Sequence, residues 1–136
     1  MYQSSKIEVN SKHRPASFYV LQNKDFFDFR LNLDIMTINE NLIGIVFRFR
    51  DEYNYYSFEL NQKSGYKRLI RVSDGRYHKI AEVHDGGLYQ NEWFKVQIRV
   101  KNSNIIIRFG QDNTNEKYNA LPVVFNLEDQ ELRKGR

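Results

Sequence analysis

Residues 27–36 read FDFRLNLDIM, with an apolar side chain at every second position. Side chains alternate between the two faces of an extended chain, so this period of two predicts a β-strand with one buried face and one wet face. A single such strand cannot bury its apolar face, and a second layer must cover it. The apolar positions are Phe27, Phe29, Leu31, Leu33 and Ile35.

The same alternation returns in four later runs, which lie within residues 43–49, 56–60, 94–100 and 105–109. Between the runs stand turn-forming residues. Asp74-Gly75 predicts a tight hairpin, because both residue types tolerate the positive φ of a type I′ turn, and Asn102-Ser103-Asn104 predicts a second turn. Short strands separated by turns favour an all-β antiparallel sandwich, with one wet side on each sheet, over a parallel α/β fold.

Length and composition limit the alternatives. The chain has 136 residues, no cysteine and a formal charge of +4, which is the size of one domain and excludes a disulfide scaffold, a thiolate metal site and a cysteine nucleophile. No apolar run is long enough to span a membrane, and no apolar segment follows Met1 as in a signal peptide. We expect an N-terminal arm over residues 1–15 and one sandwich domain over residues 16–136.

Three segments of the chain read DFFDFRL (25–31), GIVFRFRD (44–51) and NYYSFE (54–59). They resemble the concanavalin A-like, or laminin G-like, jelly-roll superfamily, and thrombospondin C-terminal domains carry similar stretches. Three later segments read GYKRL (65–69), DGG (85–87) and WFKV (93–96). They look most like jelly-roll modules of secreted multidomain proteins of apicomplexan parasites, which accompany LCCL and other adhesive domains.

The resemblance implies a jelly roll that serves as a non-catalytic binding or adhesion module of a larger secreted or surface protein, with a protein or a glycan as its partner. Residues 124–135 look like the family's approach to a last strand, and the chain stops at Arg136. We therefore expect that a closing strand is missing. An open edge near residues 121–125 would suit a second function, that of a structural domain packing against partner domains or subunits. The oligomeric state is left open.

A cationic stripe is the first candidate binding surface. Arginine pairs bidentately with anionic oxygens, so neighbouring strands with basic polar faces would suit a sulfated or sialylated glycan. The alternative is a solvated face with cross-strand pairs such as Arg48 with Glu59. The polar-phase residues are Arg30, Arg48, Arg50, Glu59 and Arg99, with Lys95 and Lys101 beside them.

The loop before Tyr56 offers a second candidate surface. Tyr53 and Tyr55 follow an acidic turn and could stack on a sugar ring, although tyrosine is also an ordinary half-buried strand residue. Tyr56 has the core phase. Asp51 and Asn54 of the same loop are weak candidates for a calcium site, since calcium needs about six to eight oxygens. No other cofactor is expected.

Nucleic-acid binding and catalysis have little support. The basic residues around the Asp74-Gly75 turn are interrupted and belong to no recognisable RNA-binding module, so neither a nucleic-acid partner nor membrane insertion is expected. These residues are Lys67, Arg68, Arg71, Arg76 and Lys79. Jelly-roll glycosidases need paired carboxylates, and Glu59 stands alone on its strand. A glycoside hydrolase relative is therefore the least favoured function, and we expect no enzyme.

Overall fold

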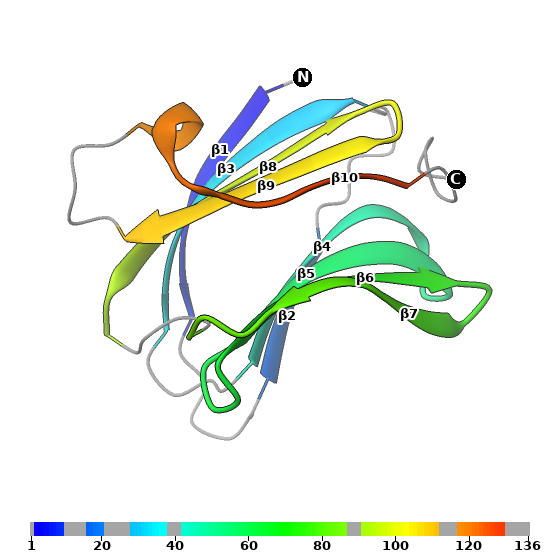
Figure 1. Ribbon diagram of the computed structural model, residues 1–136, viewed down its shortest axis with the longest axis horizontal. Helices are drawn as coiled ribbons and strands as arrows, with labels where there is room; N and C mark the ends of the chain where they lie inside the picture. The colour runs from blue at the N-terminus through cyan, green and yellow to red at the C-terminus, as the bar shows by residue number, and fades with distance from the viewer. Residues whose placement is uncertain are drawn as a thin grey trace.

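Two five-stranded β-sheets pack face to face in the computed structural model (Figure 1). The structure describes residues 2–9, 16–20, 28–37, 42–86, 91–111 and 117–129. Apolar side chains of both sheets meet between the two layers and form one core. The all-β sandwich predicted from the alternating runs is confirmed.

The first sheet has the strand order β1-β3-β8-β9-β10, and the second has the order β2-β4-β5-β6-β7. The first consists of β1 (Tyr2–Val9), β3 (Phe29–Thr37), β8 (Trp93–Lys101), β9 (Asn104–Gln111) and β10 (Val123–Glu128). The second consists of β2 (Ala16–Val20), β4 (Leu42–Asp51), β5 (Asn54–Asn61), β6 (Tyr66–Ser73) and β7 (Arg76–Val83). A short 3₁₀ helix, η1 (Tyr118–Ala120), precedes β10.

The pairing is antiparallel except at one edge of each sheet. There β1 pairs with β3, and β2 pairs with β4, in parallel. Residues 2–9 thus form a strand within the segment predicted as an N-terminal arm, while the domain boundary at residue 16 stays a prediction. Among the residues that the structure describes, no helix is long and apolar enough to cross a membrane.

Both predicted turns are confirmed. Asp74 and Gly75 have φ values of 50° and 77°, and the residues that flank them, Ser73 and Arg76, are paired across the β6–β7 hairpin. This is the positive-φ geometry that a two-residue hairpin loop needs. The β8–β9 hairpin likewise turns through Asn102, whose φ is 54°.

The core follows the alternation of the sequence. Phe47, Tyr56 and Phe58 are completely buried, and the rings of Phe47 and Tyr56 stack at 5.5 Å between centroids. From the first sheet, Leu33 and Ile35 are buried in the same cluster. Tyr56 and Phe58 therefore belong to the core, as the phase of their strand predicts.

At Arg48 the alternation fails. Its φ is 48°, and the β4–β5 register shifts between Phe47 and Asp51, which marks a β-bulge. The bulge turns Arg48 inward, so only 1% of its side chain is exposed, and its Nη2 donates to the carbonyl oxygen of Asn102 at 2.7 Å. The prediction that Arg48 lies on a wet polar face is wrong, and so is its pairing with Glu59.

Two more cations lie on the inner face of the second sheet, one at each end of the core. Lys67 pairs with Asp85 at 2.5 Å, and Arg71 pairs with Asp129. A buried charge is tolerated when it is paired and hydrogen-bonded, so these pairs close the core where the apolar rows end. The basic cluster predicted around the Asp74-Gly75 turn is accordingly divided, because these two members are part of the interior.

Candidate functional site

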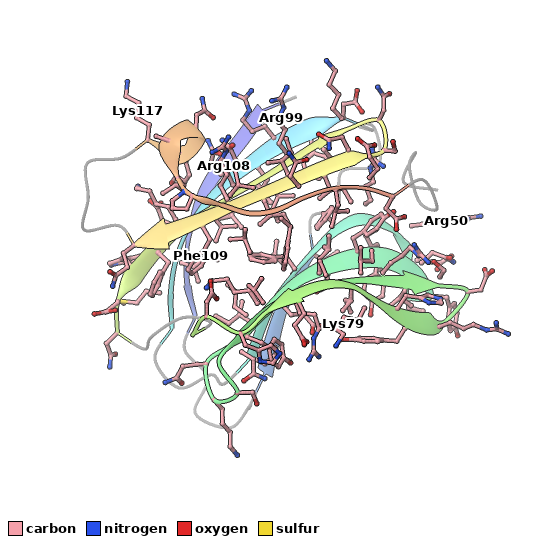
Figure 2. The ribbon with its side chains drawn as sticks, in the orientation of Figure 1. Arg50, Lys79, Arg99, Arg108, Phe109 and Lys117 are labelled. Atoms are coloured by element: carbon pink, nitrogen blue, oxygen red, sulfur yellow. The ribbon has the colours of Figure 1, made fainter. Side chains whose placement is uncertain are left out.

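The predicted cationic stripe does not exist as one surface. Arg30 and Arg99 lie on β3 and β8 of the first sheet, whereas Arg50 and Glu59 lie on β4 and β5 of the second. In Figure 2, Arg99 points away from the core on the upper side of the molecule, and Lys79 lies beyond the second sheet on the opposite side. The chain thus presents these residues on two separate outer faces.

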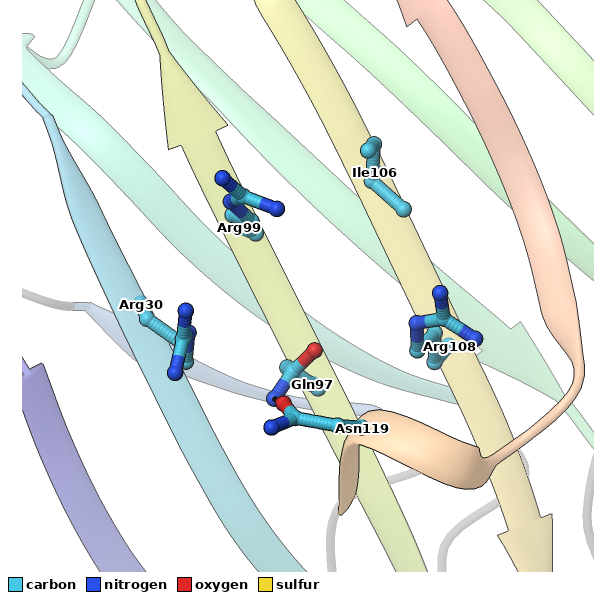
Figure 3. A pocket seen from close by; sticks show the side chains of 6 residues that line it. All are labelled: Arg30, Gln97, Arg99, Ile106, Arg108 and Asn119. Carbon is cyan, nitrogen blue, oxygen red and sulfur yellow. Dashed lines mark hydrogen bonds between the residues drawn. The ribbon is translucent and has the colours of Figure 1, made fainter.

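The outer face of the first sheet carries a hollow of about 160 Å³ (Figure 3). Strands β3, β8 and β9 supply its sides, and η1 closes one end. We call it the arginine hollow. Its lining residues are Arg30, Gln97, Arg99, Ile106, Arg108 and Asn119.

Strand register brings the three arginines together. Arg30 is directly opposite Arg99 across β3 and β8. Arg108 of β9 is opposite Gln97, which lies two residues before Arg99 on β8. Like charges placed directly opposite in a sheet destabilise it. An arrangement of this kind is favourable when an anion lies between the cations.

Side-chain amides form the floor of the hollow and hold its shape. The Nε2 of Gln97 donates to Asn32 Oδ1 at 3.0 Å and to Asn119 Oδ1 at 2.8 Å, so η1 is tied to the sheet. The Nη1 of Arg108 donates to the carbonyl oxygen of Leu121 at 2.8 Å, which orients its guanidinium. A site held by such contacts loses little side-chain entropy when a ligand binds.

One border of the hollow is electrically balanced. Lys95 pairs with Asp34 at 3.3 Å and lies 4.7 Å above the ring of Tyr118, whose hydroxyl donates to the same carboxylate. Within the described part of the chain, Arg99 and Arg108 form no ion pair. The positive charge of this face is therefore concentrated at the hollow.

On the outer face of the second sheet, a cross-strand row joins Glu59, Arg68 and Glu82. Arg68 donates to Glu82, whose other oxygen, Oε1, contacts His84 at 2.7 Å and Lys79 at 3.2 Å. The hydrogen bond from His84, with those from Arg68 and Lys79, lowers the pKa of Glu82 to about 2. Glu82 is thus a satisfied carboxylate.

Glu59 is in the opposite situation. It is only 5% exposed, and burial raises its pKa above the usual 4.5, although the charge of Arg68 and a hydrogen bond from Tyr77 oppose the shift. That bond, from Tyr77 Oη to Glu59 Oε1, is long at 3.5 Å. Burial also raises the pKa of Tyr55, the neighbouring tyrosine on β5, and the charge of Glu59 adds to that shift.

The predicted loop rim lies at the β4–β5 turn. Tyr53 is 56% exposed there, and Tyr55 packs beside Phe49 at 6.1 Å between ring centroids. Asp51 Oδ1 accepts hydrogen bonds from the backbone nitrogen of Tyr53 and from Asn54 Nδ2, and these bonds lower the pKa of Asp51. Asp51 is thus engaged in forming the turn.

The same turn is the place of the weak calcium prediction. Asn54 Oδ1 accepts from the backbone nitrogen of Asp74, so the two proposed ligands have one oxygen each committed to the fold. In the described ranges, no group of three or more His, Asp or Glu side chains could hold a metal ion. Asp51 and Asn54 alone fall far short of the six to eight oxygens that calcium takes.

The edge proposed for assembly, residues 121–125, is partly internal. Leu121 and Phe125 are buried, while Val123 at the start of β10 is 47% exposed. Strand β10 pairs with β9 on one side and forms the edge of the first sheet. Its role in assembly stays a prediction.

The sequence does not predict four members of the arginine hollow: Gln97, Ile106, Arg108 and Asn119. Arg108 falls in the polar phase of its strand between Ile107 and Phe109, so the alternation contains a signal for it. Gln97 also has the polar phase, but an uncharged amide is unremarkable in a strand. Asn119 is the last residue of a segment, 111–119, that reads as a polar loop, and only the position of η1 brings it to the hollow.

Comparison with known proteins supports the fold. No protein family model matches the chain, and a search of proteins with curated functions finds no match. Among solved structures, the carbohydrate-binding module CBM66 from Bacillus subtilis matches with a TM-score of 0.57 and 18% sequence identity, over 76% of this chain and 60% of that one. The match thus covers less than two thirds of that module.

At this level of identity, the similarity is one of fold. It confirms the β-sandwich implied by the concanavalin A-like resemblance, and the finer resemblances to thrombospondin C-terminal domains and to apicomplexan LCCL-type proteins stay predictions. The chain shares its β-sandwich architecture with a solved carbohydrate-binding module.

Proposed function

We propose that this chain is a non-catalytic binding module that recognises an acidic glycan through the arginine hollow. The observation that carries the proposal is the direct cross-strand opposition of Arg30 and Arg99, with Arg108 beside them. A sulfate or carboxylate group in the hollow would pair bidentately with the guanidinium groups.

The rest of the hollow suits a saccharide. The Gln97–Asn119 amide pair offers both donors and acceptors to sugar hydroxyls, and Ile106 offers an apolar surface to a ring. The fold shared with CBM66 supports the same class of ligand. The module would belong to a larger secreted or surface protein and would contribute adhesion to it.

A charge-matched pair of variants tests the site. Arg99→Gln with Arg108→Gln removes two positive charges from the hollow, and Arg50→Gln with Arg76→Gln removes two exposed charges from the second sheet. Binding of heparin (sulfated), polygalacturonate (carboxylated) and dextran (neutral) is measured by isothermal titration calorimetry. We expect the first pair to weaken binding of at least one acidic glycan about tenfold or more, because charge-assisted hydrogen bonds are lost.

The control pair should bind as the wild type does. Equal losses in both pairs would mean that net charge alone attracts the polymer, and this would overturn the assignment to the hollow. Because Arg108 also binds the Leu121 carbonyl, Arg99→Gln alone is measured as a variant that leaves that contact in place. Release of sugar products from any of the three polymers, abolished by Glu59→Gln, would overturn the non-catalytic function.

A further inference from the structure

The outer face of the second sheet is buried where a wet face is expected. Side chains on this face should be solvated in a two-layer sandwich, since the core lies on the other side. Yet Val46, Ser57, Glu59 and Ile70 are each no more than 5% exposed. Small residues stand on the central strands, and the longer side chains of Arg68, Tyr77 and Lys79 lie on β6 and β7.

Within this covered face, Glu59 is a carboxylate with little to bind. Among the described residues, its only hydrogen bond is the 3.5 Å contact from Tyr77, and it forms no ion pair, because Arg68 is engaged with Glu82. An ionised carboxylate can accept about four hydrogen bonds. A buried carboxylate with only one weak hydrogen bond destabilises the fold. Titratable groups of this kind are concentrated at functional sites.

A second polar group on this face has no hydrogen-bond partner. Ser57 lies two residues before Glu59 on the same face of β5, about 7 Å away along the strand. Its Oγ is fully buried and has no hydrogen-bond partner. Buried polar groups are nearly always paired, so a weakly bonded carboxylate and an unpaired hydroxyl on one face of β5 indicate a place where a ligand completes the hydrogen bonding.

Tyr77 gives the face an aromatic surface that solvent can reach. It lies on the edge strand β7 and is 54% exposed. At 3.5 Å its hydrogen bond to Glu59 is too long to hold the ring firmly. Tyr55 lies on the same outer face, near the start of β5, and both Tyr55 and Tyr77 are paired with Val72 of β6.

From these contacts we infer that the outer face of the second sheet is a separate binding site for a neutral saccharide, with Glu59 as hydrogen-bond acceptor and Tyr77 as stacking surface. A ligand hydroxyl takes the place of Tyr77 Oη at Glu59, and the Tyr77 ring contacts the apolar face of the sugar.

The charges around Glu59 favour a neutral saccharide over a charged ligand. Arg68 opposite Glu59 and Lys79 beside Glu82 disfavour a cationic ligand, and the two carboxylates disfavour an anionic one. A polyol donates and accepts through the same hydroxyl groups, so it suits a carboxylate flanked by a guanidinium. The inference does not depend on the arginine hollow, which lies on the other sheet.

The site is tested on the isotope-labelled chain by nuclear magnetic resonance. Cello-, xylo-, manno-, galacto-, malto- and fructo-oligosaccharides are added separately at millimolar concentration. We expect one of them to shift the backbone amide signals of Tyr55, Ser57, Glu59 and Tyr77. Glu59→Gln, which keeps the size of the side chain, should weaken that binding about tenfold or more. Tyr77→Ala should weaken it similarly, and Tyr77→Phe should weaken it less because the ring remains.

The arginine-hollow variant with Arg99→Gln and Arg108→Gln provides the control and should bind the neutral sugar as the wild type does. Loss of heparin or polygalacturonate binding in that variant, with neutral-sugar binding intact, separates the two sites. If none of the six sugars shifts the amide signals of this face, the inference is overturned. So would neutral-sugar binding that is unchanged by Glu59→Gln.

Discussion

Tyr56 of the second sheet donates its phenolic hydrogen bond to Oδ1 of Asp129, the residue that follows β10 of the first sheet, at 2.5 Å. The other oxygen of the same carboxylate accepts from Arg71. One buried aspartate therefore connects two strands of one sheet to the end of the other. The contact fastens the two layers where the apolar rows end.

The first prediction concerns this contact. Tyr56→Phe removes the hydroxyl and keeps the ring, so Asp129 loses one of its donors while core packing is preserved. We expect the free energy of unfolding to fall by about 1.5–3 kcal/mol, the range for hydrogen bonds to charged groups. Urea denaturation measures it. Tyr53→Phe is the control, since Tyr53 is exposed, and should change stability by less than about 0.5 kcal/mol.

The second prediction contrasts two neighbouring arginines. Arg48→Ala leaves the Asn102 carbonyl without its donor and opens space in the interior, so we expect a loss of about 2 kcal/mol in urea denaturation. Arg50→Ala removes an exposed side chain and should stay within about 0.5 kcal/mol of the wild type. Equal effects of the two substitutions would contradict the inward orientation of Arg48.

The third prediction concerns pH. The folded-state pKa of Glu59 is raised above 4.5, so the folded state holds its proton more tightly than the unfolded state does. This contribution to stability is full below a pH of about 4.5 and is lost as the pH rises through the folded pKa. We therefore expect Glu59→Gln to be more stable than the wild type near neutral pH, by thermal or urea unfolding, with the advantage fading in acid.

Glu82 provides a control of opposite sign. Its folded pKa of about 2 lies below the usual 4.5, so its contribution is present above that usual value and is lost as the pH falls towards 2. Glu82→Gln should accordingly be less stable than the wild type at neutral pH, and the two proteins should converge in strong acid. A stabilising effect of both substitutions at neutral pH would show that the two carboxylates are not in different environments.

The fourth prediction separates geometry from charge in the arginine hollow. Arg99→Lys keeps the positive charge but cannot form a bidentate pair, so we expect affinity for the acidic glycan bound by the wild type to fall about three- to tenfold. The measurement is calorimetry at two salt concentrations, since screening weakens the charge contribution in both proteins. A lysine variant with wild-type affinity would mean that the hollow acts only as a point charge.

Much of the fold is predictable because the core obeys a simple period. The alternating runs identify Leu33, Phe47 and Phe58 as internal, and the Asp-Gly pair predicts its hairpin from backbone preference alone. Arg48 escapes this reasoning because the bulge places three residues of β4, 48–50, opposite the single residue Tyr55 of β5, and the Arg48 side chain turns inward. The sequence around it reads as an unbroken alternation, whereas the inward side chain of Arg48 binds Asn102, far along the chain.

The candidate sites are less predictable, since they depend on which strands become neighbours. Arg30 and Arg99 are correctly assigned to polar strand positions, but only the pairing of β3 with β8 makes them opposite partners. Glu59 has the polar phase as well, yet it is buried on a central strand whose neighbours the sequence does not identify. Strand order is a property of the whole chain, and local alternation does not contain it.

The order of the strands has a kinetic consequence. Strands β4 to β7 are consecutive, and short turns join them, so the pairs of this meander form with little loss of chain entropy. The first sheet needs β3 to find β8 across all the chain from Thr37 to Trp93. Contacts between residues distant in sequence form slowly, so the folding nucleus should lie in β4 to β7. Substitutions there would mainly slow folding, and those in β3 and β8 would mainly speed unfolding.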